Sequence, residues 1–357
     1  MSRIRGIASK IALGFVLVGT FLVVTEAVLR IPMGHRLFST HGVLGLEFLA
    51  WDAFHGLDLV ASTSALGVGV NSLGHRGAEL DPARPRRIVT MGDSSTFGVW
   101  VERPPGGVGE SISHFDSYPA ELQVLLDESG HEDWQVINTG VPGSHSSHSM
   151  RILLGEVLEL EPDIVTLRVG ANEHAVPDTR WIGDPKSPYW RKLFYLLGDL
   201  RTFQAGLAIF ERLTAEQEAG FHISLQQFAD DLAEFARLGR ERGFHLVLLD
   251  YPLGPASAYA SNSGEIALFY GEPNLDSMYR THALYQRTLR SVAEREGVAL
   301  LITAPVLEGS ATPSFGSSFM HPNATGMGIT AELLYDYFAS AGWLDKAPPT
   351  RPTAPAR

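Results

Sequence analysis

The sequence predicts an α/β protein, a flavodoxin-like, doubly wound three-layer α/β/α sandwich built on a parallel five-stranded sheet. The first observation is a set of five short apolar runs that are continuous rather than alternating, which is typical of strands buried on both faces. The second is that helical segments separate these runs, and this alternation indicates crossover connections between parallel strands. The five runs are residues 87–91, 134–138, 163–169, 244–249 and 298–303.

Three of the intervening segments have apolar residues at the three- and four-residue spacing of an amphipathic helix. They are marked by Leu122, Leu125 and Leu126 after Pro119, by Leu225, Phe228, Leu232, Phe235 and Leu238 before Gly243, and by Ile329, Leu333, Leu334, Tyr337 and Phe338. Residues 178–220 are aromatic and irregular, and we expect them to form an insertion over one edge of the sheet. The sequence therefore predicts one catalytic domain over residues 87–343.

The N-terminus has the pattern of a membrane anchor. Arg3, Arg5 and Lys10 precede an apolar run that extends from residue 11 to residue 29 and is interrupted by Glu26. A span needs about 20 residues, and Glu26 can reach the interface. No cleavage site of the A-x-A kind follows, so residues 1–31 are predicted to be an uncleaved signal-anchor transmembrane helix, with a buried amphipathic helix as the alternative. Basic residues before the span place the bulk of the chain on the extracytoplasmic side.

The remaining segments and the composition narrow the possible functions. Residues 32–86 are predicted to be a juxtamembrane segment that partly packs on the domain, and the Pro- and Ala-rich residues 344–357 a disordered tail. The 357 residues carry a formal net charge of -12 and include no cysteine. Nucleic-acid binding needs clustered Lys and Arg, which the body of the chain lacks. A Cys nucleophile, disulfides and thiolate zinc sites are likewise excluded.

Ligands of such a sheet bind beyond the carboxyl ends of its strands, and four of the loops there carry polar or glycine-rich motifs. These motifs are Gly92-Asp93-Ser94-Ser95, the run from Asn138 to Gly143, Gly170-Ala171-Asn172-Glu173, and His321-Pro322-Asn323. Each one alone is also an ordinary turn or helix cap. Together they bring a hydroxyl, a backbone N–H, a side-chain amide and an imidazole to one edge of one sheet.

Those groups are the ones that acyl transfer needs. Ser94 becomes a nucleophile when His321 takes its proton, and the same imidazole then protonates the leaving alcohol. The oxyanion of the tetrahedral intermediate needs fixed donors. The backbone N–H of Gly143, the amide of Asn172 and the N–H of Ser94 at the start of a helix can supply them.

Taken with their spacing, the four motifs resemble the SGNH/GDSL hydrolase family, whose four blocks contribute Ser, Gly, Asn and His in that order. The resemblance covers roughly residues 87–340, and the segment 70–77 also looks like one seen in membrane-anchored bacterial members. It implies the SGNH hydrolase fold and hydrolysis of carboxylic esters, or a related acyl transfer, with no metal and no other cofactor.

One position departs from the family pattern, which usually has an Asp three residues before the catalytic His. Here that residue is Ser318. Three interpretations follow: a Ser–His dyad whose imidazole is oriented by Ser318 or a backbone carbonyl, a substitute carboxylate such as Glu308, or a catalytically weak protein that keeps the fold for binding. With an ordinary pKa for His321, activity would be lost near pH 6–7.

Several neighbouring residues are expected to have lesser roles. His145 and His148 lie on a Ser-rich loop and, with His174, are expected to face substrate or solvent rather than a metal. Glu173 replaces the Asp that is more common in the family, with little consequence expected. Asp93 is expected to brace the nucleophile turn.

The resulting hypothesis is a membrane-anchored, extracytoplasmic serine esterase. It would cleave acyl or acetyl esters of a small molecule or glycan through an acyl-enzyme on Ser94. One alternative is an O-acyltransferase acting on cell-envelope polysaccharide, because the same acyl-enzyme can be resolved by a sugar hydroxyl. The other is a non-catalytic envelope-binding module on the same fold, which the missing Asp would favour.

Overall fold

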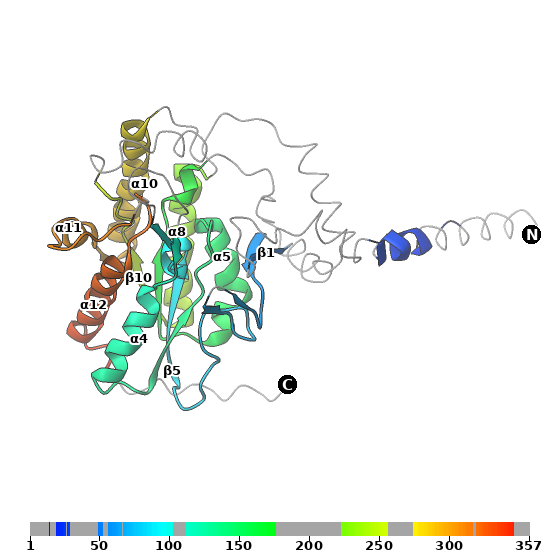
Figure 1. The fold of residues 1–357 in the computed structure, drawn as a ribbon, viewed down its shortest axis with the longest axis horizontal. Helices are drawn as coiled ribbons and strands as arrows, with labels where there is room; N and C mark the ends of the chain where they lie inside the picture. The colour runs from blue at the N-terminus through cyan, green and yellow to red at the C-terminus, as the bar shows by residue number, and fades with distance from the viewer. Residues whose placement is uncertain are drawn as a thin grey trace, which may run out of the picture. The chain divides into compact units, whose positions relative to one another are not determined.

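The computed structural model of the chain describes residues 14, 19–25, 27–28, 49–52, 56–65, 67–102, 112–175, 223–255, 274–316 and 319–345. Two compact units make up the chain. One contains Met1–Asp58 and Asp178–Glu218, and the other contains Leu59–Pro177 and Ala219–Arg357. Figure 1 shows the sheet and its helices in the second unit. The predicted insertion at 178–220 and most of the predicted tail lie outside the described residues.

The central sheet has five parallel strands, as predicted. They are β5 (Arg86–Gly92), β8 (Trp134–Asn138), β9 (Ile164–Arg168), β10 (His245–Leu249) and β11 (Ala299–Leu301). The spatial order is β11-β10-β9-β5-β8 with every pairing parallel. Numbered along the chain, this is the flavodoxin-like order 2-1-3-4-5, so the connections change direction between β5 and β9. The predicted α/β sandwich is confirmed, and its switch point lies beyond the carboxyl ends of β5 and β9.

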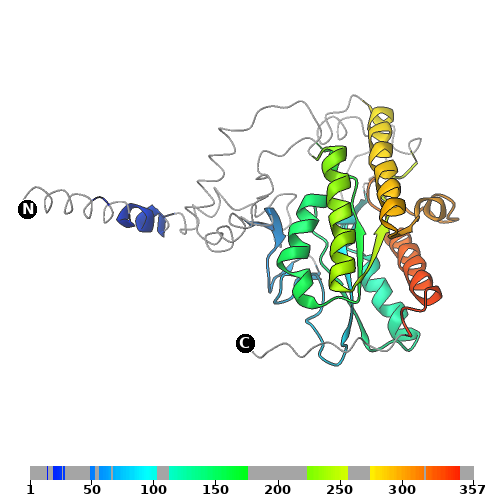
Figure 2. The same cartoon turned by 180° about the vertical axis from the view of Figure 1, so that it is seen from behind.

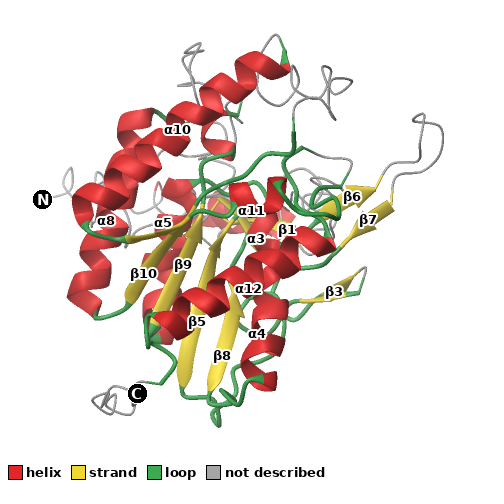
Figure 3. Cartoon of the chain, turned by 90° about the vertical axis from the view of Figure 1, so that its left-hand side faces the viewer, coloured by secondary structure: helices red, strands yellow, loops and turns green. Residues whose placement is uncertain are grey.

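Helices cover both faces of this sheet (Figure 3). On one face α4 (Tyr118–Glu128) packs against α12 (Ala324–Ser340). On the other, α8 (Leu225–Arg242) packs between α5 (Ser146–Gly155) and α10 (Leu275–Glu296), and Figure 2 shows α5 and α8 side by side. The three predicted helices correspond to α4, α8 and α12. Gly243 ends α8 in the left-handed conformation, with φ of 83°.

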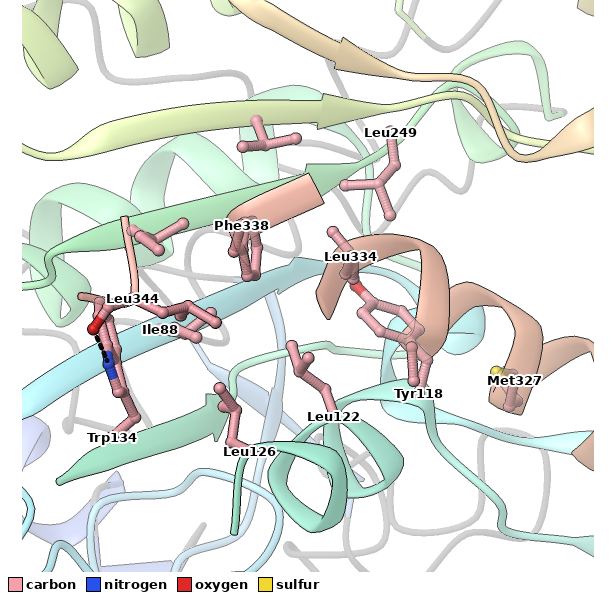
Figure 4. Close-up of a cluster of buried hydrophobic side chains, with 13 residues drawn as sticks. Ile88, Tyr118, Leu122, Leu126, Trp134, Leu249, Met327, Leu334, Phe338 and Leu344 are labelled. Atoms are coloured by element: carbon pink, nitrogen blue, oxygen red, sulfur yellow. Dashed lines mark hydrogen bonds between the residues drawn. The ribbon is translucent and has the colours of Figure 1, made fainter. Parts of the chain in front are cut away.

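The core between the sheet and the two helices α4 and α12 is made of apolar side chains from β5, β8, β9, β10, α4 and α12 and from Leu344 after α12 (Figure 4). The indole N–H of Trp134 donates to the carbonyl of Leu344 at 3.3 Å, which fixes the chain just after α12 against this core. The buried members are Ile88, Tyr118, Leu122, Leu126, Trp134, Ile164, Val247, Leu249, Met327, Ala331, Leu334, Phe338 and Leu344.

Truncating one of these side chains is expected to lower the stability of the whole unit. Leu334 is fully buried in the core, so Leu334→Ala should reduce the free energy of unfolding by about 2–5 kcal/mol. Its neighbour Leu333 on α12 is only half-buried, and Leu333→Ala is the matched control with a smaller expected loss. Urea unfolding of the full chain, followed by tryptophan fluorescence, measures both. Equal losses in the two variants would contradict this assignment of the core.

The N-terminal part of the chain is described only in pieces. None of the helices among the described residues is both long and apolar enough to cross a membrane. Most of the predicted anchor at 1–31 lies outside those residues. Short antiparallel pairs are formed by β3 (Ser64–Ala65) with β4 (Val68–Gly69), and by β6 (Trp100–Glu102) with β7 (Ile112–His114). A two-stranded sheet joins β1 (Leu49–Asp52) to β2 (Gly56–Leu59). The unit that contains the central sheet begins at Leu59, within the segment predicted to be juxtamembrane.

Candidate active site

The turn after β5 presents Ser94 at the switch point of the sheet. Gly92 ends the strand with φ of 154°, and a Cβ there would lie 2.5 Å from the carbonyl oxygen of Arg168. Only glycine can therefore begin this turn. Asp93 caps the short helix α3 (Ser94–Phe97), because its Oδ1 accepts the N–H of Ser95 at 2.9 Å. Ser94 is the first residue of that helix.

His321 approaches the same point from the other end of the chain. It lies just before Asn323, whose Oδ1 caps α12 by accepting the N–H of Gly326 at 3.1 Å, and whose amide donates to the carbonyl of Pro313 at 2.9 Å. The cap thereby fixes the loop that carries the imidazole. His321 Nε2 lies 2.8 Å from Ser94 Oγ, although 227 residues separate them in sequence. The structure therefore brings the predicted nucleophile and base together at hydrogen-bonding distance.

Burial sets the protonation state of this imidazole. Desolvation lowers the pKa of His321 to about 4, since a charged ring is disfavoured away from water. At neutral pH the ring is therefore neutral, and its Nε2 can accept the hydroxyl proton of Ser94 when Nδ1 carries the ring proton. The expectation of activity loss near pH 6–7 assumed an ordinary pKa, and partial burial of the ring places the pKa below that value.

Of the two residues predicted to orient His321, the structure describes only Glu308. Ser318 lies outside the described residues. Glu308 is the last residue of α11 (Ala304–Glu308), where its side chain is exposed, and no ion pair joins it to His321 in the described part of the chain. The structure therefore does not bring the Glu308 carboxylate to the imidazole, because α11 ends at the surface.

The two predicted oxyanion donors flank the nucleophile turn. Asn172 begins the short helix η4 (Asn172–His174) after β9, and its amide nitrogen donates to Asp93 Oδ2 at 2.9 Å and to the carbonyl of Ser144 at 2.8 Å. Both of its N–H groups thus have acceptors, and an oxyanion would have to share one. Gly143 adopts φ of 82° and is half-exposed between buried neighbours. Asn172 therefore connects the turn of Ser94 to the loop of Gly143.

Asp93 is a buried carboxylate at the centre of this arrangement. Burial raises its pKa to about 7, while hydrogen bonds from Ser95 and Tyr251 and the nearby positive charge of Arg168 act in the opposite direction. The Tyr251 hydroxyl lies 2.6 Å from Ser95 Oγ and 3.4 Å from Asp93 Oδ1. Ser95 is thus bonded to Tyr251 and not to His321, which agrees with the choice of Ser94 as the candidate nucleophile. Asp93 braces the turn, as expected.

Tyr251 is a site residue that the sequence reasoning missed. It lies two residues beyond the end of β10, and the carbonyl of its own backbone accepts His282 Nε2–H at 2.8 Å. Since a carbonyl can only accept, His282 Nδ1 is left to accept from His174 Nε2 at 3.2 Å. The rule that places functional groups at the carboxyl ends of strands would have found Tyr251 if it had been applied to the fourth strand as well.

Three histidines that were expected to face substrate or solvent do not face solvent. His145, His148 and His174 are all buried, at 3%, 0% and 2% exposure. His145 caps α5 and His148 lies within that helix, so this segment is not a loop. Burial lowers the pKa of His174 well below its usual value. No group of three or more potential metal ligands occurs among the residues that the structure describes.

Glu173 has a larger structural role than expected. Its Oε1 accepts the N–H of Ser146 at 2.8 Å and its Oε2 accepts the N–H of Gly170 at 2.7 Å. The side chain is completely buried, and this burial raises its pKa to about 8. Glu173 therefore ties the start of α5 to the turn that presents Asn172.

The contact between Asp93 and Asn172 can be tested by Asp93→Asn. The new amide can still accept from Ser95, but it then presents N–H groups to the amide nitrogen of Asn172, where two donors meet. We expect kcat for p-nitrophenyl acetate to fall by up to about 10²-fold, since small displacements of catalytic groups have effects of this size. The protein should remain folded by circular dichroism. A variant with the wild-type kcat would show that this contact does not position Asn172.

A serine hydroxyl reacts with esters when a neutral imidazole is held ready to take its proton, and Ser94 and His321 meet this condition on a doubly wound sheet. This arrangement is typical of α/β hydrolases. The model of the GDSL-like Lipase/Acylhydrolase family matches residues 90–329, and the chain belongs to this family. It is accordingly an enzyme that hydrolyses ester bonds.

Solved structures similar to this chain include three enzymes of low sequence identity. A lipase/acylhydrolase from Enterococcus faecalis is 15% identical, with 72% of this chain and 96% of that chain covered and a TM-score of 0.44. An α/β hydrolase from the metagenome of Lake Arreo, Spain, is 21% identical, covering 74% and 98%, with a TM-score of 0.44. A variant of an acetyl xylan esterase from Geobacillus stearothermophilus is 18% identical, covering 70% and 93%, with a TM-score of 0.43. No curated protein matches the chain.

Proposed function

We propose that this protein is a serine esterase that cleaves acyl or acetyl esters of a small molecule or glycan through an acyl-enzyme on Ser94. The observation that carries the proposal is the 2.8 Å contact between Ser94 Oγ and the Nε2 atom of a partly buried, neutral His321. Ser94 Oγ attacks the ester carbonyl carbon while its proton passes to Nε2. The tetrahedral intermediate then collapses, the bond to the alcohol oxygen breaks, and His321 returns the proton to that oxygen. Water repeats these steps on the acyl-enzyme and releases the acid.

The oxyanion is stabilised by donors from three loops. The N–H of Ser94 lies at the start of α3, where the helix dipole favours negative charge. The N–H of Gly143 has no side chain beside it. The amide of Asn172 joins them when its hydrogen bond to Ser144 or Asp93 is shared with the substrate oxygen. Each such donor typically contributes on the order of 10²–10³ in rate.

The test is an assay of the purified full-length chain on p-nitrophenyl esters of acetate and of longer acids, together with a fluorophosphonate probe. We expect hydrolysis and covalent labelling of Ser94. Addition of a soluble saccharide distinguishes an esterase from an acyltransferase. An esterase releases free acid at an unchanged rate. Transfer of the acyl group to the sugar would identify the protein as an acyltransferase instead. A wild-type chain that neither hydrolyses nor becomes labelled would instead match the non-catalytic binding module.

We also propose that the catalytic unit is held on the extracytoplasmic side of a membrane by residues 1–31. The proposal rests on the basic residues before the apolar run. Because the chain has no cysteine, single cysteines report topology cleanly. Ser291→Cys, on the exposed face of α10, should react in intact cells with a membrane-impermeant maleimide, whereas Ser2→Cys should react only after lysis. The opposite pattern would reverse the orientation.

A further inference from the structure

Residues 70–79, here called the strap, form an ordered loop that precedes the region matched by the family. The side chain of Asn71 holds the loop together from inside. Its Oδ1 accepts the N–H groups of Leu73 and His75 at 3.0 and 2.9 Å, and its Nδ2 donates to the carbonyl of Ala78 at 2.9 Å. Asn71 and His75 are both buried. The strap therefore has a defined shape of its own.

The strap is also bonded to the end of β8 and to the residue that follows α5. The backbone N–H of Arg76 donates to the carbonyl of Asn138, the last residue of β8, at 3.0 Å. His75 Nε2 lies 3.0 Å from Glu156 Oε2, just beyond α5. These contacts place Arg76 beside the sheet edge from which the loop of Gly143 begins.

From that position the Arg76 guanidinium reaches the C-terminal end of α3, the helix that begins with Ser94. Its Nη1 donates to the carbonyl of Phe97 and, at 3.3 Å, to that of Gly98, while its Nη2 donates to the carbonyl of Phe115 at 2.6 Å. The guanidinium carbon lies 4.8 Å from the centre of the Phe97 ring, in cation–π contact. Burial lowers the pKa of Arg76 to about 10, so the group remains a cation at neutral pH.

Helix α3 needs such external support because it has only four residues. One turn of helix is unstable by itself, and the carbonyls at its end have no partners within it. Asp93 holds the N-terminal end, and the amide of Asn138 donates to the carbonyl of Thr96 at 3.0 Å. Arg76 supplies the donors for the last carbonyls, where a positive charge is also favoured by the helix dipole.

We infer that Arg76 is a positioning residue for Ser94 and that the strap, by holding Arg76 in place, helps to maintain the geometry of the active site. This inference rests on the proposed role of Ser94 as nucleophile. Without the guanidinium, α3 loses the donors at its C-terminal end, and the hydroxyl at its first residue can move relative to His321. A misplacement of about 1 Å can reduce turnover by about 10²-fold.

The experiment compares Arg76→Ala and Arg76→Lys with Arg84→Ala in the full-length chain. Arg84 is the matched control: it lines the same cavity as Arg76, its guanidinium also binds a carbonyl, that of Trp134 at 3.0 Å, and it pairs with Asp127 on α4 instead of with α3. We expect Arg76→Ala to lower kcat for p-nitrophenyl acetate about 10- to 100-fold with little change in KM. The rate of fluorophosphonate labelling at Ser94 should fall in parallel. Arg76→Lys keeps the positive charge but not the planar set of N–H donors, so its kcat should lie between those of wild type and Arg76→Ala.

A second readout separates positioning from stability. Millimolar guanidinium ion should restore part of the activity of Arg76→Ala, because Arg76 lines a cavity of about 650 Å³ that a small cation can enter. Arg84→Ala should lower the Tm but keep the wild-type kcat and show no rescue. The inference is overturned if kcat of both Arg76 variants matches wild type, or if activity simply follows Tm in all three variants. A wild-type chain unreactive at Ser94 would overturn the proposed function as well.

Discussion

Ser94→Ala is expected to lower kcat for p-nitrophenyl acetate by on the order of 10³-fold or more, the range found when a catalytic serine is removed. The physical reason is that Ser94 Oγ, 2.8 Å from His321 Nε2, is the hydroxyl whose proton the imidazole can take. Alanine leaves the base in place but provides no oxygen to form the acyl-enzyme. Fluorophosphonate labelling should be lost together with hydrolysis, and the fold should be retained, since Ser94 Oγ lies at the site rather than in the core.

Ser95→Ala is the matched control, one residue away in the same helix. Its hydroxyl is bonded to the Tyr251 hydroxyl at 2.6 Å and to the carbonyl of Met320 at 3.4 Å. The variant should therefore still be labelled, and mass spectrometry of the labelled peptide should place the adduct on Ser94. An adduct on Ser95, or a Ser94→Ala variant that hydrolyses at the wild-type rate, would rule out Ser94 as nucleophile.

The strands were predictable because each is buried on both faces and is therefore apolar without interruption. Long helix α10 was not found, and its composition explains why. Polar Thr281 and His282 are buried in the helix at 8% and 5% exposure, next to apolar Met278 and Tyr285. They interrupt the apolar stripe that identified α4, α8 and α12. Tertiary contacts, with His174 and with the backbone of Tyr251, make burial of His282 possible.

The ends of the strands identified Ser94, Gly143, Asn172 and His321 because parallel strands deliver their following loops to one edge. The exposure of a histidine cannot be predicted in this way, because it depends on residues distant in sequence. His174 is buried against a partner 108 residues away, and no local sequence pattern indicates such a partner. The same limit applies to Arg76, whose carbonyl acceptors lie 21 to 39 residues further along the chain.

The availability of the Asn172 amide depends on tertiary contacts. The sequence identifies an amide at the right strand end, and this much follows from the motif. Whether its two hydrogens are available depends on Asp93 and Ser144, 79 and 28 residues away. Since both are occupied, oxyanion binding at Asn172 must compete with two existing hydrogen bonds.

Acidification is expected to leave kcat/KM high well below neutral pH and to reduce it by about tenfold per pH unit only below about pH 4. The base must be neutral to accept the proton of Ser94. Burial of His321 disfavours its charged form and lowers its pKa to about 4, so protonation removes the base as the pH falls through that value. An ordinary histidine would produce the same loss near pH 6–7. The profile is measured by following acid release with the full-length chain.

Asp93, behind the nucleophile, also titrates within the range of this profile, because burial raises its pKa to about 7. Its protonation as the pH falls weakens the acceptor for Asn172 and can add a shallower inflection near pH 7. Asp93→Asn cannot titrate, so this inflection should be absent from its profile while the limb near pH 4 remains. Circular dichroism at each pH separates loss of the base from unfolding. A steep limb at pH 6–7 that persists in Asp93→Asn would mean that His321 is fully solvated, which would contradict the lowered pKa expected for the partly buried Ser94–His321 pair.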